Sequence, residues 1–347
     1  MGRMLISRDT ARYAEIDAAK VRSGRFLTRR GDWLAEPVLE FLRTCGATEF
    51  VDPFAGEGHL FTQLAAAGFD LPTVGYDIAP EGAQVANDSL RSIPAHPTAA
   101  IVTNPPYLAR HSASRKGVLR GLRRYYTAGG HADLYQVAIR RALDSAPCVI
   151  AIVPETFLHA NVLRERLTRA VVIGAQVFDD TTTPVCVACF GPDPRDLADI
   201  DVFLDDHRLG SMADLDALRR VAYGDADIRF NAATGRIALQ AVDGVTPGLR
   251  IGFLPRSKRD YDAAGIKHSS RLVTFLDVPG VKSSAQVARL CELANDRIAT
   301  LRTGIGELAL SPFKGNDNTG ARRRRLDYRQ ARAVLSQARL DLALEDD

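Results

Sequence analysis

Short apolar runs alternate with amphipathic segments over the first 190 residues of the chain. The apolar runs predict β-strands at residues 49–52, 73–77, 100–103, 148–153, 171–173 with 176–178, and 185–190. Apolar positions with helical spacing predict helices between several of these strands, at residues 33–42, 60–67 and 132–143. This alternation predicts a parallel, doubly wound α/β sheet with helices on both faces. Ligands of such sheets bind at the carboxyl ends of the strands.

The regular alternation ends at a polar stretch rich in proline and aspartate, residues 191–196. This composition predicts a domain boundary, with one domain over residues 1–192 and a second over residues 193–347. The second part has short strands, loops and a final helical stretch at residues 328–344. A chain of 347 residues, 46% of them hydrophobic, is long enough to bury two cores.

The sequence contains no apolar run near the ~20 residues that cross a bilayer, and its start lacks the apolar stretch of a signal peptide. We therefore expect a cytoplasmic protein without a membrane partner. The five cysteines are odd in number and irregularly spaced, which predicts reduced thiols. Cys186 and Cys189 lie within one apolar run, which favours buried thiols over zinc or redox chemistry, so no metal site is expected.

The net charge of +3 hides two basic segments. Residues 108–132 contain no acid, and their cations are Arg110, Arg115, Lys116, Arg120, Arg123 and Arg124. The second segment, residues 250–332, includes Arg256, Lys258, Arg259, Lys267, Arg271 and the block Arg322, Arg323, Arg324 and Arg325. Such clusters predict an acidic partner, with nucleic acid as the leading candidate. For any single cluster the alternative is a solvated surface.

The tetrapeptide Asn104-Pro105-Pro106-Tyr107 directly follows a predicted strand. Its prolines remove two backbone donors and hold the turn extended, so the Asn104 side-chain oxygen and the Pro105 carbonyl oxygen can face one small cavity. Two such acceptors suit a planar NH2 group, and the ring of Tyr107 can stack on the plane that carries this group. The alternative is an ordinary turn at the end of a strand.

A second turn, residues 52–58 (D-P-F-A-G-E-G), lies between a predicted strand and a predicted helix. Gly56 and Gly58 allow a tight turn and a close approach to a ligand, and the helix start presents free N–H groups. Asp77 ends the next strand, where a carboxylate can accept hydrogen bonds from ribose hydroxyls. Asp52 favours a cationic ligand over a pyrophosphate. S-adenosylmethionine, with a ribose, an adenine and a sulfonium but no phosphate, fits this description.

The series D-P-F-A-G-E-G, G-Y-D-I at residues 75–78, and N-P-P-Y resembles the signatures of class I amino-methyltransferases. Their order is that of the γ class of DNA adenine-N6 methyltransferases of restriction-modification systems. Residues 20–28 resemble an element that this class carries ahead of the glycine turn, although Arg29 stands where the family usually has proline. The resemblance covers roughly residues 20–190. It implies a Rossmann-like class I methyltransferase domain, S-adenosyl-L-methionine as cofactor, and a C-terminal target-recognition domain.

The resemblance also implies the roles of individual residues. The expected cofactor contacts are Thr28, Asp52, Pro53, Gly56, Gly58, Asp77 and Asp88. Asp88 matches the acid that binds the adenine amino group, the alternative being a helix cap. The catalytic residues are Asn104, Pro105, Pro106 and Tyr107. Phe178 falls where the family places a second aromatic ring, which stacks on the flipped base opposite Tyr107. The alternative is that Phe178 is a core residue.

The expected DNA contacts come from both basic segments. They are Arg110, Arg115, Lys116, Arg256, Lys258, Arg259, Lys267, Arg322 and Arg323. Further candidates for base reading are His268 and residues 314–318, because arginine and lysine read guanine and asparagine reads adenine in the major groove. Most of these charges are expected to contact phosphates or nothing.

The N-P-P-Y motif itself indicates a planar nitrogen rather than DNA, because relatives with this signature methylate glutamine amides and related enzymes act on ribosomal RNA. The element at residues 20–28, the basic segment after Tyr107 and the length of the C-terminal part favour double-stranded DNA. The prediction is a monomeric, site-specific DNA adenine-N6 methyltransferase that flips its target base and protects host DNA beside a separately encoded restriction endonuclease. The alternatives are an RNA or protein-glutamine methyltransferase and a catalytically silent nucleic-acid-binding protein.

Overall fold

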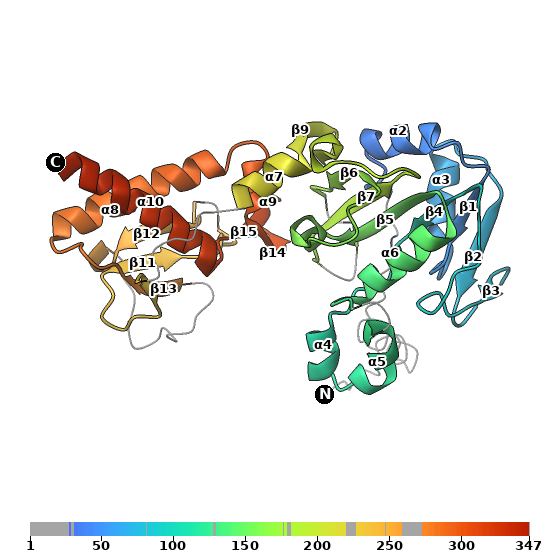
Figure 1. Cartoon of the computed structure of the whole chain (residues 1–347), viewed down its shortest axis with the longest axis horizontal. Helices are drawn as coiled ribbons and strands as arrows, with labels where there is room; N and C mark the ends of the chain where they lie inside the picture. The colour runs from blue at the N-terminus through green and yellow to red at the C-terminus, as the bar shows by residue number, and fades with distance from the viewer. Residues whose placement is uncertain are drawn as a thin grey trace, which may run out of the picture. The chain divides into compact units, whose positions relative to one another are not determined.

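The computed structural model describes residues 28, 31–80, 82–127, 130–175, 177–178, 182–219, 227–246, 248–258 and 273–346 (Figure 1). The chain divides into two compact units, Met1–His207 and Arg208–Asp347. No helix in the described part of the chain combines the length and the apolar character needed to cross a bilayer.

A nine-stranded mixed sheet forms the centre of the first unit, in the order β3-β2-β1-β4-β5-β7-β6-β8-β9. Its strands are β1 (Glu49–Asp52), β2 (Thr73–Asp77), β3 (Val85–Ala86), β4 (Ala99–Thr103), β5 (Cys148–Pro154), β6 (Leu167–Val172), β7 (Val185–Phe190), β8 (Asp201–Leu204) and β9 (His207–Ser211), in which the boundary between the units falls. β1 pairs in parallel with both β2 and β4, and β4 pairs in parallel with β5. The predicted strands up to residue 190 are confirmed, except that residues 173 and 177–178 lie outside β6 and residue 176 lies outside the described residues.

The sheet departs from the expected parallel arrangement at β7, which runs antiparallel to β5 and β6. The chain returns from β6 to β7 through residues 173–184 without a crossover helix among its described residues, as an antiparallel pair allows. β4 and β7 are buried along their whole length, as apolar strands covered on both faces are. Helices of this unit include α2 (Glu36–Thr44), α3 (His59–Ala66) and α6 (Leu134–Ser145), and a short 3-10 helix, η1 (Glu155–His159), follows β5.

A helical hairpin separates β4 from α6. It consists of α4 (Arg110–Arg115) and α5 (Leu119–Thr127). The hairpin packs around a small apolar cluster of its own, formed by the buried residues Leu108, Ala113, Tyr125, Tyr126 and Leu134. The hairpin therefore lies in the sequence between the N-P-P-Y turn and α6.

The chain continues in the first unit beyond residue 193, where the sequence predicted a boundary. A short 3-10 helix, η2 (Leu197–Asp199), leads into β8, which pairs in parallel with β6 and so extends the same sheet. The polar stretch at residues 191–196 is therefore a connection between two strands of one sheet, and the two compact units divide at residues 207 and 208.

The second unit contains a four-stranded sheet, a two-stranded hairpin and helices. The sheet has the order β10-β13-β11-β12, with β10 (Arg229–Phe230), β11 (Ile237–Gln240), β12 (Gly252–Pro255) and β13 (Val273–Asp277). The hairpin pairs β14 (Ser311–Asn316) with β15 (Arg322–Arg325). The helices are α7 (Met212–Arg219), η3 (Arg256–Lys258), α8 (Ser284–Leu301), α9 (Gly306–Ala309) and α10 (Tyr328–Asp346). Side chains from α8, α10 and this sheet share one apolar core, and α10 confirms the predicted final helix.

Candidate active site

A cavity of about 280 Å³ lies at the carboxyl ends of β1, β2 and β4. The turn after β1, the end of β2 and the turn after β4 all contribute to its wall. Many of the residues singled out from the sequence line it: Thr28, Asp52, Pro53, Gly56, Asp77, Asp88, Asn104 and Pro106. The fold thus brings the predicted cofactor contacts and the predicted catalytic amide to one place, as expected for a doubly wound sheet.

The glycine turn after β1 forms one wall of the cavity. Gly56 and Gly58 have φ angles of 51° and 75°, in the left-handed region that glycine adopts without steric cost. Gly58 does not line the cavity but is the N-cap of α3. The Asp77 carboxylate accepts hydrogen bonds from the backbone N–H of Gly56 at 3.3 Å and of Ala79 at 2.9 Å. These bonds hold the Asp77 carboxylate against the turn.

Asp52 is a buried carboxyl group beside this turn, 2% exposed. Its Oδ1 accepts hydrogen bonds from the Thr103 hydroxyl at 2.7 Å and from the Phe54 N–H at 3.0 Å. Burial raises the pKa of Asp52 to about 7, and the negative charge of Asp77 adds to this effect, while the two hydrogen bonds oppose it. Asp52 has no ion-pair partner among the described residues, so its carboxyl group suits a cationic ligand.

Asp88 lies at another part of the cavity wall, on the turn after β3. Its Oδ2 accepts hydrogen bonds from the Tyr125 hydroxyl at 2.8 Å and from Nη2 of Arg124 at 3.3 Å. Tyr125 and Leu122 of α5 also line the cavity, and sequence reasoning assigned neither a role there. The amphipathic pattern of α5 was the available signal, since the helix combines exposed cations with buried tyrosines.

Asn104 follows β4, and both the nitrogen and the oxygen of its side-chain amide make hydrogen bonds. Its Nδ2 donates a hydrogen bond to Oγ1 of Thr28 at 2.9 Å. The Tyr107 hydroxyl lies 2.6 Å from Oδ1 of Asn104 and 2.8 Å from the carbonyl oxygen of Ile152, on β5. The amide is thus contacted by Thr28, from a distant segment of the chain, and by Tyr107, three residues further on.

The segment after N-P-P-Y is tied to the start of α6. Oδ1 of Asp133 accepts a hydrogen bond from the Leu108 N–H at 2.9 Å. The Gln136 side chain in turn accepts from the Asp133 N–H at 3.4 Å, which completes a capping box at the start of α6. Burial raises the pKa of Asp133 to about 6. These contacts tie the segment after the N-P-P-Y turn to the start of α6.

Tyr107 and Phe178, the two predicted stacking residues, contact each other. Their ring centroids are 6.1 Å apart, with an angle of 64° between the ring planes. Tyr107 is 9% exposed and Phe178 is 1% exposed. An edge-to-face contact leaves no space for a planar base between the rings. Stacking of a base between them therefore requires the two rings to separate.

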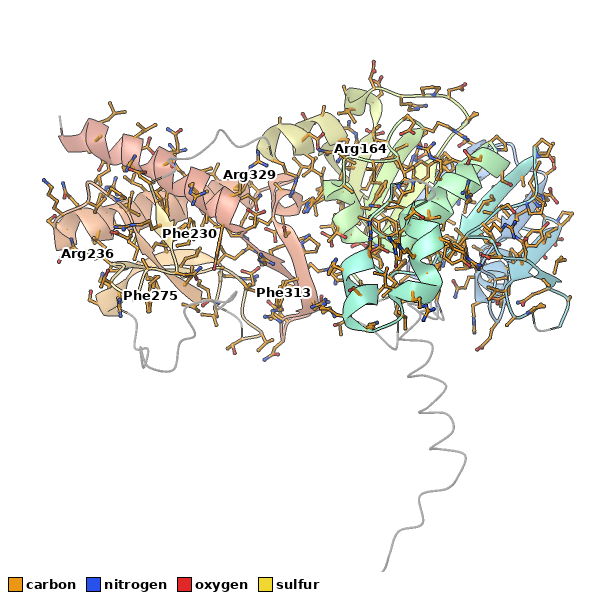
Figure 2. All side chains as sticks on the ribbon, turned by 60° about the horizontal axis from the view of Figure 1, so that its bottom comes forward. Arg164, Phe230, Arg236, Phe275, Phe313 and Arg329 are labelled. Carbon is orange, nitrogen blue, oxygen red and sulfur yellow. The ribbon has the colours of Figure 1, made fainter. Side chains whose placement is uncertain are left out.

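The predicted DNA contacts divide by exposure. Arg110, Arg115, Lys116 and Lys258 are exposed. Arg256 and Arg323 are half-buried over the rings of Phe275 and Phe313, both labelled in Figure 2, at 4.2 and 4.9 Å from the ring centroids.

The four-arginine block forms β15 and makes contacts inside the second unit. The Arg322 guanidinium donates a hydrogen bond to Asn316 at 3.1 Å, and Nε of Arg323 donates to the carbonyl oxygen of Asp243 at 2.8 Å. Arg324 is 2% exposed. Arg259 and Lys267, with His268, lie outside the described residues.

No protein-family model matches the chain, and no curated protein matches it by sequence. Among solved structures, a putative class I S-adenosylmethionine-dependent methyltransferase from Listeria monocytogenes is similar to it at 11% identity, over 56% of this chain and 72% of the other, with a TM-score of 0.38. A type I restriction-modification methyltransferase subunit from Streptococcus thermophilus is similar at 17% identity, over 56% of this chain and half (50%) of the other, with a TM-score of 0.35.

The M protein of the type I restriction enzyme EcoKI is similar at 12% identity, over 92% of this chain and 70% of the other, with a TM-score of 0.35. The topology of the sheet identifies the fold independently of these likenesses. Strands β3-β2-β1-β4-β5 form a doubly wound sheet that is completed by an antiparallel β7 between β5 and β6. By this topology the first unit has the Rossmann-like fold of class I methyltransferases, followed by an additional C-terminal unit.

Proposed function

We propose that the protein is a site-specific DNA methyltransferase that transfers a methyl group from S-adenosylmethionine to N6 of adenine in double-stranded DNA. One observation carries the proposal: the Asn104 amide lines the same cavity as the carboxyl groups of Asp52, Asp77 and Asp88. The carboxyl groups suit a ligand with a cationic centre, ribose hydroxyls and an adenine amine, and the amide suits the amine that receives the methyl group.

The cavity wall fits S-adenosylmethionine better than a dinucleotide. Asp77 ends β2 beside the glycine turn, where it would accept hydrogen bonds from the ribose hydroxyls. Asp88 would accept from the adenine amine, and the buried Asp52 would balance a positive charge. No lysine or arginine is among the residues of the described chain that line the cavity, so a pyrophosphate would have no cationic partner there.

The reaction requires little of the protein beyond orientation and charge stabilisation. The bound cofactor would supply an electrophilic methyl group from its sulfonium sulfur and would be left as a neutral thioether, and the methylated amine would lose one proton to water. Oδ1 of Asn104 and the carbonyl oxygen of Pro105 would accept hydrogen bonds from the adenine amine and stabilise the positive charge that develops on it. Thr28 and Tyr107 would hold the Asn104 amide in place, because both contact it from opposite ends.

The basic hairpin next to the cavity favours a nucleic acid over a glutamine amide. Six exposed cations lie on this hairpin or at its ends, and residues 108–132 contain no acid. A duplex is attracted to such a surface through its phosphates. Arg256, Lys258 and the second unit would then contribute to target recognition. We further propose that the enzyme protects host DNA beside a separately encoded restriction endonuclease.

The test is methyl transfer from labelled S-adenosylmethionine to mixed-sequence duplex DNA, an RNA hairpin and a glutamine peptide, with digestion of the product to nucleosides. N6-methyladenine in the duplex supports the proposal, whereas labelled RNA or peptide without labelled DNA contradicts it. Asn104→Ala should lower the transfer rate by about 10²–10³-fold, as loss of a charge-stabilising group does, and should leave cofactor affinity unchanged. Asn161→Ala, at an exposed asparagine, is the matched control.

A further inference from the structure

The α4–α5 hairpin has one face in the cavity and another that is cationic. On the inner side, Leu122 and Tyr125 line the cavity, and the Tyr125 hydroxyl donates a hydrogen bond to Oδ2 of Asp88 at 2.8 Å. Tyr125 itself is buried, with 7% of its surface exposed. This contact joins the hairpin to the carboxylate that would bind the adenine amine.

The hairpin is internally packed, so its two faces cannot move independently. Tyr125 and Tyr126 share the apolar cluster that also contains Ala113 of α4. The Tyr126 hydroxyl donates a hydrogen bond to the carbonyl oxygen of Leu108 at 2.6 Å, just after the N-P-P-Y turn. A force on the outer face of α5 is therefore transmitted to Tyr125 through close-packed side chains.

The outer side of the hairpin carries cations available to a polyanion. Arg110, Arg120 and Arg123 are exposed, and their side chains have no hydrogen-bond or ion-pair partner within the described ranges. Arg124 is also exposed and contacts Asp88 at 3.3 Å. DNA phosphates that contact Arg120 and Arg123 would hold α5 by electrostatic attraction, on the side of the helix opposite to the cavity.

We propose that Tyr125 is a positioning residue through which duplex DNA on α5 strengthens cofactor binding. DNA bound at Arg120 and Arg123 fixes α5, and the Tyr125 hydroxyl then fixes the Asp88 carboxylate. Oδ1 of Asp88, which has no protein hydrogen-bond partner in the described part of the chain, is left to accept from the adenine amine. This inference rests on the proposed function. Because coupling between two sites is reciprocal, the cofactor must strengthen DNA binding by the same factor.

The test measures the dissociation constant of S-adenosylhomocysteine for the full chain by calorimetry, with and without a mixed-sequence DNA duplex at low salt. We expect the duplex to strengthen binding about tenfold, within the usual range for coupled sites. Tyr125→Phe keeps the ring but loses the hydroxyl, so the ratio of the two constants should fall to about one. Tyr76→Phe, which removes the hydroxyl of an equally buried tyrosine outside the hairpin and the cavity wall, is the matched control and should keep the wild-type ratio.

A second variant tests the outer face. Arg120→Ala with Arg123→Ala changes two exposed side chains, so it should fold and keep the affinity for S-adenosylhomocysteine measured without DNA. The double variant should weaken duplex binding. Each arginine removed should lower the number of ions released on binding by about one, so that binding depends less on salt concentration. The coupling ratio should also fall.

The outcomes separate the inference from the proposed function. A wild-type ratio of one, with both ligands bound, overturns the coupling and leaves the methyltransferase proposal standing. A wild-type ratio that Tyr125→Phe preserves overturns the role of Tyr125. If the wild-type chain binds no S-adenosylhomocysteine, the cofactor assignment itself fails.

Discussion

Nδ2 of Asn104 donates a hydrogen bond to Oγ1 of Thr28 across 76 positions of the sequence, at 2.9 Å. Thr28 is 4% exposed, and its carbonyl oxygen accepts a hydrogen bond from the Gln63 side chain of α3 at 2.7 Å. The Gln63 side chain also accepts from the Trp33 indole at 2.5 Å. Thr28 is thus anchored to the first unit while it orients the amide. The family resemblance implies a cofactor contact for Thr28, and this geometry adds a role in positioning Asn104.

Thr28→Val removes the hydroxyl that orients Asn104 while keeping the side-chain shape. We expect the turnover number for methyl transfer to fall about tenfold, the cost of one hydrogen bond, with a smaller change in cofactor affinity. Thr28→Ser retains the hydroxyl and should stay within about twofold of wild type. Single-turnover kinetics and calorimetry measure the two quantities. A large loss of cofactor affinity with an unchanged turnover number would instead show that Thr28 acts on the cofactor alone.

Asp52 gives the folded state a pH dependence. Its pKa is raised from the ordinary value of 3.8 to about 7, chiefly by burial. Because the folded pKa lies above the unfolded one, the stabilising contribution of the protonated carboxyl is fully present below pH 3.8 and is lost as pH rises through about 7. The free energy of unfolding should therefore decrease over this window.

Asp52→Asn removes that titration but keeps an oxygen that accepts from Thr103 and Phe54. Urea unfolding at about pH 5 and about pH 8 should show a smaller decrease in the free energy of unfolding for this variant than for wild type. At the higher pH the variant should be the more stable protein, yet it should bind S-adenosylmethionine less tightly. Equal pH profiles for the two proteins would contradict the raised pKa.

Asp88 should make the protein prefer a ligand that carries the adenine amine over one that lacks it. Wild type should bind S-adenosylhomocysteine about 10–100-fold more tightly than its inosine analogue, in which a carbonyl replaces the amine, because a hydrogen bond to a charged group is lost. Asp88→Ala should reduce this preference to about one, and Asp199→Ala, at an exposed carboxylate, should preserve it. Competition binding measures both ratios. If Asp88→Ala weakens both ligands equally, Asp88 does not read the amine.

Asp243 should hold the second unit together. It is 1% exposed, and its carboxylate accepts hydrogen bonds from the Arg302 guanidinium at 2.8 and 3.0 Å and from the Arg324 N–H at 2.9 Å. Although burial opposes ionisation, these hydrogen bonds keep the pKa of Asp243 below its usual value. Asp243→Ala leaves Arg302 without this partner and should lower the free energy of unfolding by about 3–5 kcal/mol.

The matched control for Asp243 is Asp341, whose ion pair with Arg297 is partly exposed. Asp341→Ala should cost less than about 1 kcal/mol, because water screens the pair. Urea unfolding followed by circular dichroism compares the two variants. Similar losses in the free energy of unfolding would show that the buried network around Asp243 stabilises the protein no more than the partly exposed ion pair does.

The amino-acid sequence was enough to predict six strands of the first unit and the place of the candidate site. The apolar runs at residues 49–52, 73–77 and 185–190 became strands with these bounds, because the side-chain period and burial of a strand are local properties. Gly56 and Gly58 indicated a tight turn after the first strand, and both have positive φ. Residues at the carboxyl ends of neighbouring strands had to meet, which placed Asn104 in one cavity wall with Asp77.

Tertiary structure alone decided which side chains contact each other across the chain. The Asn104–Thr28 and Asp88–Tyr125 hydrogen bonds, the edge-to-face contact of Tyr107 with Phe178, and the antiparallel direction of β7 follow from packing between segments far apart in sequence. The arginine block shows the reason most clearly, because its four side chains are alike in sequence but differ in what packs around them. Arg324 is buried and its Nε lies 3.5 Å from a carboxylate oxygen of Glu307, whereas the other three arginines of the block are half-buried.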